Sequence, residues 1–272
     1  MDSVILNWRR NIYRLRLKVF KPEKFSRLQK SRFPLEDHRC IFVHVPKCAG
    51  ISVGTSLFGQ DFAPTHRSLN GYLADFGPKD FQSYLKFTVV RNPYDRLASA
   101  YFFLKKGGIN EEDKNWAEKI LLSYDSFDAF VKGWVNKKNI QTEIHFRPQC
   151  DFICLESNRP GVDFIGYYEN LAADFQHICR KINSNSTLLA KNRNANKEKD
   201  FRAYYTEETK AIVADVYADD IRVLGYAFGN SSLQNQLAMR DRKVAQVGSR
   251  NAGIAPLTAA RPAPPIPSCP RR

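Results

Sequence analysis

The sequence lacks the features of a secreted or membrane-spanning chain. No apolar run is long enough to cross a bilayer, and the N-terminus has no uninterrupted apolar stretch of the kind found in signal peptides. The six cysteines show no pairing framework, and Cys150 and Cys154 do not have the CxxC spacing of a zinc site. We therefore expect a cytoplasmic protein with reduced cysteines and no bound metal.

The sequence also lacks an even spread of basic residues. The net charge is +14, but residues 1–40 carry +7 and residues 240–272 carry +6, so the residues between them carry only +1. No RNP, zinc-finger or helix-turn-helix signature accompanies this charge. The composition therefore predicts no nucleic-acid partner, and it gives only weak support for a polyanionic substrate.

Basic and apolar residues alternate at the N-terminus in the period of a helix. The apolar positions are Ile5, Trp8, Ile12, Leu15 and Val19. They predict a basic amphipathic helix over residues 3–20, which could lie on an anionic membrane surface, on a partner or on its own domain. Residues 23–39 read as a polar linker, residues 40–230 as the main domain, and residues 231–272 as a disordered basic tail rich in proline and alanine.

Residues 41–52, IFVHVPKCAGIS, read as a buried strand that stops at a turn of small residues. A strand, a tight turn and a helix N-terminus form an anion site, because unpaired backbone amides point into the turn. Lys47 adds a full positive charge there. The Walker pattern GxxxxGK[ST] does not occur in the chain, which argues against an ordinary nucleotide triphosphatase.

Residues 87–103, FTVVRNPYDRLASAYFF, repeat this arrangement of a strand followed by a helix. Asn92 is a good N-cap, and Pro93 fits the first helical position. Arg91 ends the strand and Ser99 falls on the polar side of the helix. A guanidinium and a hydroxyl in this placement are suited to holding a phosphate.

The two stretches resemble the donor-binding motifs of the carbohydrate O-sulfotransferases, a family that includes heparan sulfate 2-O-sulfotransferase and bacterial relatives. PKCAGIS is similar to the family's 5'-phosphosulfate loop, and RNPYDRLASAY to its 3'-phosphate motif. The resemblance runs from about residue 40 to residue 228, and it implies 3'-phosphoadenosine 5'-phosphosulfate (PAPS) as co-substrate. The implied PAPS contacts are Lys47, Cys48, Ala49, Gly50, Ser52, Arg91 and Ser99. Cys48 and Ile51 replace threonines that are common in the family, which removes hydroxyl donors from the loop.

The resemblance also implies roles for two histidines. Relatives carry a catalytic histidine between the two motifs, and His66 is the only histidine there. It is therefore expected to take the proton of the acceptor hydroxyl, while Lys47 neutralises the leaving phosphate. His145 and Arg147 lie in a segment similar to the family's H-x-x-P-Q element, which implies contact with the acceptor. The alternative for that segment is a solvated turn.

Residues 189–205 form a polar, basic stretch punctuated by aromatic residues. In relatives a comparable loop closes over the nucleotide, so Asn192 and Arg193 are implied contacts of the donor. A solvated loop is the alternative interpretation.

Strands alternate with helices along the chain, and both phosphate sites follow strands. This order predicts an α/β fold, a mostly parallel sheet with helices on both faces and the ligand at the carboxyl ends of the strands. The resemblance implies a metal-independent O-sulfotransferase with a carbohydrate or glycolipid acceptor. Two alternatives stay open, a P-loop-like nucleotide-dependent kinase and a non-catalytic adaptor for membranes or polyanions.

Overall fold

The computed structural model describes residues 11–15, 18–156, 159–189, 200–229, 233–234, 236–238 and 240. Its centre is a parallel sheet with the strand order β1-β2-β5, formed by β1 (Cys40–Val43), β2 (Leu85–Val90) and β5 (Phe164–Tyr167). In its register Phe42 pairs with Phe87, and Phe87 pairs with Phe164. The prediction of a parallel α/β sheet is confirmed.

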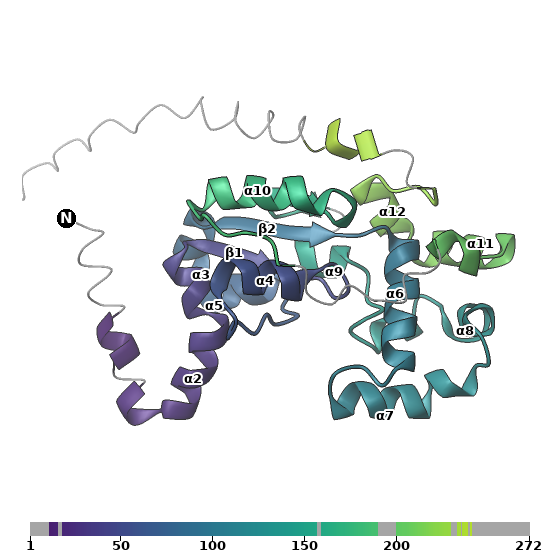
Figure 1. Cartoon of the computed structure of the whole chain (residues 1–272), viewed down its shortest axis with the longest axis horizontal. Coiled ribbons are helices and arrows are strands. Elements are labelled where there is room, and N and C mark those ends of the chain that lie inside the picture. Colours follow the sequence, from purple (N-terminus) through teal and green to yellow (C-terminus); the bar gives the residue numbers. More distant parts are fainter. Residues whose placement is uncertain are drawn as a thin grey trace, which may run out of the picture.

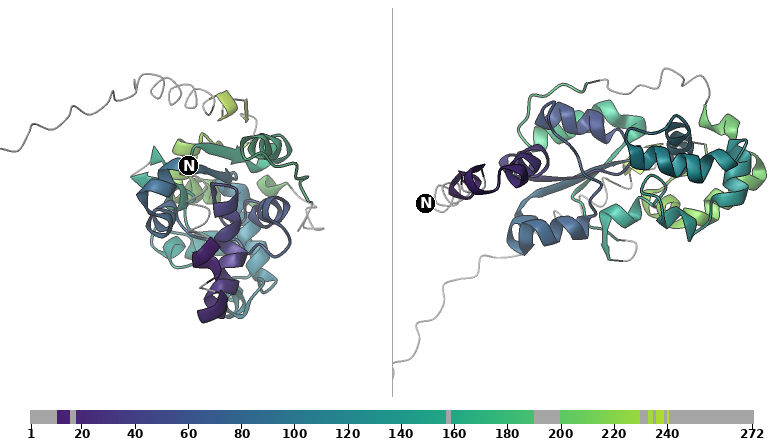
Figure 2. Two further views of the ribbon diagram at one scale, coloured as in Figure 1. Left: turned by 90° about the vertical axis from the view of Figure 1, so that its left-hand side faces the viewer. Right: turned by 90° about the horizontal axis from the view of Figure 1, so that it is seen from below.

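Helices pack on both faces of this sheet (Figure 2). They include α4 (Gly50–Phe58), α5 (Leu69–Ser83) and α10 (Leu171–Lys181). α10 contacts β2 and β5, and α5 contacts β1. Burial from both sides explains why the strands read as continuous apolar runs rather than as alternating patterns.

A second, helical lobe lies beyond the carboxyl ends of the strands (Figure 1). It consists of α6 (Pro93–Lys105), α7 (Glu111–Lys119), α8 (Phe127–Trp134) and α11 (Glu207–Val216). Its core is aromatic, with Phe130 stacked on Trp134 at 5.2 Å between ring centroids and Phe146 fully buried beside them. Since β2 leads directly into α6, this strand joins the two parts of the molecule.

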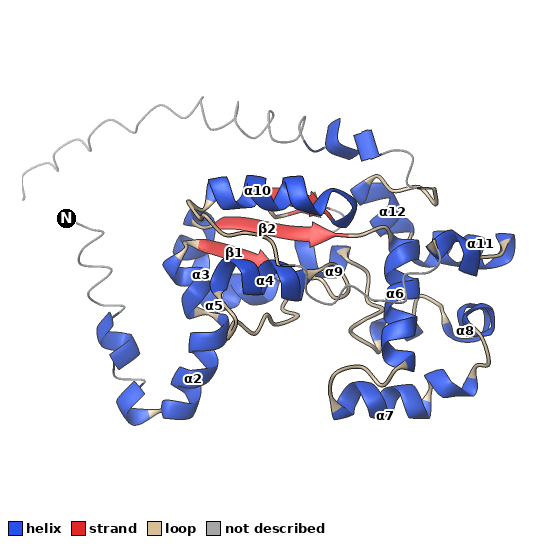
Figure 3. Ribbon diagram, viewed as in Figure 1, coloured by secondary structure: helices blue, strands red, loops and turns tan. Residues whose placement is uncertain are grey.

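Short elements complete the described chain (Figure 3). They are α9 (Cys150–Ile153), α12 (Ala218–Leu224), the antiparallel pair β3 (Cys154–Glu156) and β4 (Arg159–Pro160), and the 3-10 turns Leu121–Ser123, Asn139–Gln141, Tyr168–Asn170 and Phe201–Tyr204. Within the described residues, none of the helices has the length and apolar character needed to span a membrane.

The interpretation of residues 23–39 as a polar linker is wrong. Two helices occupy it, α2 (Pro22–Ser31) and α3 (Phe33–Asp37). Pro22 starts α2, because the first helical position needs no amide hydrogen, and α3 buries Phe33 on the body of the protein. Upstream of them, residues 11–15 and 18–20 are helical, as predicted.

The remaining terminal predictions fall largely outside the described residues. Residues 3–10 of the N-terminal helix and residues 241–272 of the predicted tail belong to this group. Of the tail, residues 233–234, 236–238 and 240 are described, and the prediction of disorder is wrong for them: they are helical, and Gln236 is only 2% exposed. Nη1 of Arg240 lies 2.7 Å from Oδ1 of Asp174 on α10.

Candidate functional site

The predicted phosphate loop lies at the carboxyl end of β1. Lys47 and Ala49 both have positive φ angles, 67° and 60°, and this backbone turn brings the chain into α4 at Gly50. The first amides of a helix have no partner within it, so those of α4 can bind an anion. Gly50 is required here because a Cβ atom would lie 1.7 Å from Cδ2 of His44.

Lys47 is held against an aromatic ring. Its Nζ lies 3.5 Å from the ring centroid of Phe103 on α6, which is a close cation–π contact. Burial, aided by the positive charge of Arg91, lowers the pKa of Lys47 to about 7. An anion bound next to Nζ would favour the protonated form and raise this pKa again.

The Cys48 side chain turns into the protein. Its Sγ lies 3.6 Å from the carbonyl oxygen of Pro46 and 3.4 Å from Oε1 of Gln149. Burial raises the pKa of the thiol to about 12, so Cys48 remains neutral. The thiol of Cys48 is therefore turned away from any ligand in the loop, and Ser52 is buried in the first turn of α4.

Arg91 connects the two predicted phosphate motifs. Its Nη1 donates to the Lys47 carbonyl at 3.2 Å, and its Nε and Nη2 each donate to the Asp95 carboxylate at 2.8 Å. Its guanidinium also stacks on the ring of Tyr168 at 4.2 Å. Asp95 and Ser99 follow at steps of four, so both share the helix face next to Arg91. Within the described residues the hydroxyl of the partly exposed Ser99 makes no hydrogen bond.

The side chain of Gln149 contacts both predicted phosphate motifs. It is fully buried, and its Oε1 accepts from the Arg91 amide at 2.9 Å while its Nε2 donates to the Arg91 carbonyl at 2.8 Å. The backbone N–H of Gln149 donates to the carboxylate of the buried Asp220 on α12 at 2.8 Å. With its contact to Cys48, Gln149 fixes both phosphate motifs relative to each other, a role that the sequence did not reveal.

Arg96 is a second positioning residue that the sequence interpretation missed. Its side chain is 1% exposed, the largest among the fully buried ones. Its Nε donates to the Pro46 carbonyl at 3.0 Å and its Nη2 to the His145 carbonyl at 3.2 Å. The signal in the sequence was a charged residue directly beside Leu97 of the apolar helix face. A long charged side chain that is buried there must find hydrogen-bond partners inside the protein.

Three histidines line up beside the loop. The His66 ring lies 4.4 Å from that of His44 and 5.9 Å from that of His145, measured between centroids. Nδ1 of His66 is 3.3 Å from the carbonyl oxygen of His44. A proton on Nδ1 satisfies that carbonyl and leaves the lone pair on Nε2. Burial lowers the pKa of His66 below its usual range, so the ring is neutral at physiological pH.

His145 forms a buried pair with a carboxylate. Its Nε2 lies 3.1 Å from Oδ1 of Asp113 on α7, and burial lowers its pKa to about 4 against the opposing influence of that carboxylate. Nδ1 of His145 is buried and has no hydrogen-bond partner among the residues that the structure describes. Asp113, Glu143 and His145 each offer a metal-ligating atom within 4.8 Å of the others, a set that suits a transition metal. The hydrogen bond between Asp113 and His145 accounts for part of this grouping without a metal.

Arg147 and His66 line the same cavity of about 240 Å³. Arg147 is exposed there, and its Nε donates to the Gln141 carbonyl at 3.1 Å. The structure thus brings the predicted base and one predicted acceptor contact together, next to the phosphate loop. Asn192 and Arg193 lie outside the described residues.

Comparison with known proteins gives a family and a small set of relatives. The model of the sulfotransferase family matches residues 33–227. Carbohydrate sulfotransferase 14 of mouse and of human is 30% identical over 129 residues, which are 42% of this chain and 34% of the length of those relatives. An uncharacterised protein of Archaeoglobus fulgidus is 36% identical over 107 residues, 39% of this chain and 73% of that protein. No solved structure matches significantly.

Proposed function

This chain belongs to the sulfotransferase family, and from that premise we propose that it transfers a sulfuryl group from PAPS to a hydroxyl of a carbohydrate or glycolipid acceptor. One observation carries the proposal. Arg91 donates to the Lys47 carbonyl, so the residues suited to the 5'- and 3'-phosphates of one nucleotide lie in a single hydrogen-bonded unit. The neutral, partly buried His66 beside this unit supplies a base for the acceptor.

The donor half of the mechanism is charge stabilisation. The amides of Ala49, Gly50 and Ser52 hold the 5'-phosphosulfate, and Lys47 neutralises the phosphate as the bond from sulfur to its oxygen breaks. Arg91 and Ser99 hold the 3'-phosphate. The product is adenosine 3',5'-bisphosphate.

The acceptor half is proton removal and alignment. The acceptor hydroxyl oxygen forms the new bond to sulfur, and its proton passes to Nε2 of His66. Arg147 contacts the acceptor in the cavity that it shares with His66. His145 supports this side from its buried position against Asp113.

A direct assay tests the proposal. Incubation of the full chain with PAPS carrying labelled sulfate and a panel of neutral and acidic glycans and glycolipids, followed by mass analysis, should give sulfated products. A parallel reaction with ATP and Mg²⁺ tests the kinase alternative. Phosphorylated products would exclude the proposed reaction. The absence of any sulfated product, from protein that binds PAPS, would also exclude it.

Arg91→Ala should remove most of the preference for PAPS over adenosine 5'-phosphosulfate, which lacks the 3'-phosphate. A charge-assisted hydrogen bond of this kind contributes about 1.5–3 kcal/mol, so the ratio of kcat/KM for the two donors should fall about ten- to a hundred-fold. The ratio cancels any general loss of folded enzyme caused by leaving Asp95 unpaired. Arg27→Ala, at an exposed position on α2, is the control. Full discrimination in Arg91→Ala would show that the motif has another role.

Gln149→Leu should weaken binding of adenosine 3',5'-bisphosphate by about tenfold or more. Leucine fills a similar volume but leaves the Arg91 amide and carbonyl buried without partners, at a cost of about 1–3 kcal/mol for each group. Calorimetric titration would measure the affinity for the bisphosphate, and thermal unfolding would measure the loss of stability. Gln82→Leu, an exposed exchange of the same type, is the control. Unchanged affinity in Gln149→Leu would refute the positioning role.

We also propose that the N-terminal helix touches a membrane surface. Arg14 fastens this helix to the body, because its Nη1 donates to Asp37 at 2.9 Å and its Nη2 to Glu36 at 3.0 Å. The apolar side is left outside, with Leu15 62% and Val19 63% exposed. An apolar surface within a segment of net positive charge fits the interface of an anionic bilayer.

Vesicle sedimentation should therefore show binding to phosphatidylserine-containing vesicles and little binding to pure phosphatidylcholine. Val19→Glu should lower the partition coefficient about tenfold, because the substitution removes an apolar side chain that would enter the bilayer interface and adds a charge that anionic lipids repel. Leu122→Glu changes an apolar residue that is 55% exposed elsewhere on the surface and serves as the control. Equal losses in both variants would contradict a specific role for the helix.

A further inference from the structure

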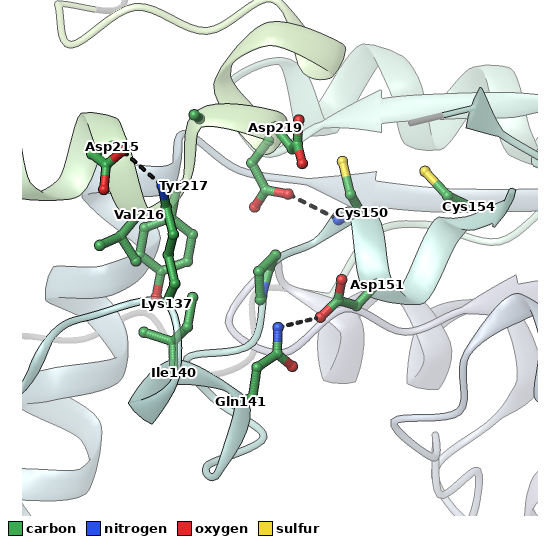
Figure 4. A pocket seen from close by; sticks show the side chains of 13 residues that line it. Lys137, Ile140, Gln141, Cys150, Asp151, Cys154, Asp215, Val216, Tyr217 and Asp219 are labelled. Carbon is green, nitrogen blue, oxygen red and sulfur yellow. Dashed lines mark hydrogen bonds and ion pairs between the residues drawn. The ribbon is translucent and has the colours of Figure 1, made fainter. Parts of the chain in front are cut away.

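A second cavity adjoins the one that contains His66. Its volume is about 640 Å³, compared with about 240 Å³ for the cavity of His66. Asp151 lines both, so the two cavities meet at the start of α9. Figure 4 shows Asp151 and Gln141 in the lining of the larger cavity, joined by a hydrogen bond of 2.9 Å from Nε2 of Gln141 to Oδ2 of Asp151. Asp151 is therefore a wall residue that the larger cavity shares with the cavity of His66.

The walls of the larger cavity combine planar polar groups with apolar surface. The amide of Gln141 and the carboxylates of Asp151 and Asp219 can bond to hydroxyl groups as acceptors, and the amide can also donate. Pro148 and Val216, both partly exposed, supply apolar surface next to them. Sugar rings present hydroxyls at their edges and C–H groups on their faces, and both kinds of surface find partners here. The volume also lies within the range of about 300–1,000 Å³ that holds drug-sized ligands.

The charges of this lining select among sugars. Asp151, Asp215 and Asp219 face the cavity. Lys137, the one basic side chain in the lining among the described residues, bonds to Asp215 at 2.7 Å, and Arg222 of α12 bonds to Asp219 at 2.8 Å, which leaves Asp151 without an ion-pair partner among the described residues. The lining therefore has an excess of negative charge. Carboxylate or sulfate groups on a ligand would be repelled, whereas uncharged sugars would not.

We propose that the larger cavity binds the uncharged sugar rings that follow the ring carrying the reacting hydroxyl. The acceptor is then an oligosaccharide or glycan chain without acidic groups over this stretch, rather than a small alcohol or a single sugar. This inference rests on the proposed sulfotransfer, because it takes the His66 cavity as the reaction site. It adds a binding region that extends from Asp151 to α12.

Binding should be measured with a length series of β-1,4-linked N-acetylglucosamine, from a single ring up to the pentamer, in the presence of adenosine 3',5'-bisphosphate. Affinity should rise at least tenfold from the single ring to the pentamer. Ala218→Trp places a bulky side chain into the larger cavity from an exposed position, and it should remove this gain without changing binding of the bisphosphate. Ala173→Trp, at an exposed position on α10, is the matched control and should keep the gain.

Three outcomes would overturn the inference: affinity independent of chain length, a gain that survives in Ala218→Trp, or a gain found only with uronate-containing hyaluronan oligosaccharides. The result is separable from a failure of the proposed function. If labelled PAPS sulfates no glycan, sulfotransfer itself is refuted. If glycans are sulfated with the same KM at every length, only the extended acceptor site is refuted.

Discussion

Lys47→Ala should lower kcat for sulfuryl transfer by about 10²–10³-fold while weakening binding of adenosine 3',5'-bisphosphate much less. The charge of Lys47 matters most when negative charge grows on the departing phosphate, so its loss falls on the transition state rather than on the ground state. Rapid-quench turnover with labelled PAPS, together with calorimetric titration of the bisphosphate, separates the two effects. Equal losses in turnover and binding would argue against a role in the transition state.

The pH dependence provides a second readout for Lys47. Its pKa in the protein without ligand is about 7, so the charge is present below that pH and is lost as pH rises through it. Because a phosphate binds best to the protonated form, kcat/KM for PAPS should decline above about pH 7. Lys47→Arg should remove this decline, since a guanidinium stays charged, and Lys79→Ala at an exposed position should leave it intact.

Local patterns in the sequence were sufficient for the sheet and for the two strand–turn–helix units that carry the predicted phosphate motifs. The strand β1, the turn at Lys47 and the start of α4 depend on neighbouring residues, as do Asn92 as N-cap and the spacing of Arg91 from Ser99. Each of these features is encoded within about a dozen consecutive residues.

The buried residues that position the site could not be predicted in the same way, because their hydrogen bonds join distant parts of the chain. Gln149 bonds to Arg91, 58 residues away, and to Asp220, 71 residues away. His145 meets Asp113 across 32 residues. In the sequence Gln149 looks like a polar residue in a turn after a proline, and only the tertiary fold makes it a buried link between two phosphate motifs.

His66→Ala should reduce turnover by about 10²–10⁴-fold while leaving affinity for adenosine 3',5'-bisphosphate nearly unchanged. The variant removes the nitrogen proposed to take the acceptor proton, but it leaves Lys47 and Arg91 in place. In the wild-type protein the rate should fall at low pH as His66 becomes protonated. That fall should lie below the pH expected for an exposed histidine, because burial lowers the pKa of His66. The low-pH limb should disappear in His66→Ala.

The rival base is His145, and the structure gives reasons to rank it second. Its Nε2 is engaged with Asp113, it is only 7% exposed, and burial lowers its pKa to about 4. His66 instead lines the cavity that is proposed to hold the acceptor. Its Nδ1 bonds to the carbonyl of His44, which leaves Nε2 to accept a proton. His145→Ala should therefore retain the low-pH limb and lose less activity. Near-normal turnover in His66→Ala, with collapse in His145→Ala, would transfer the role of base to His145.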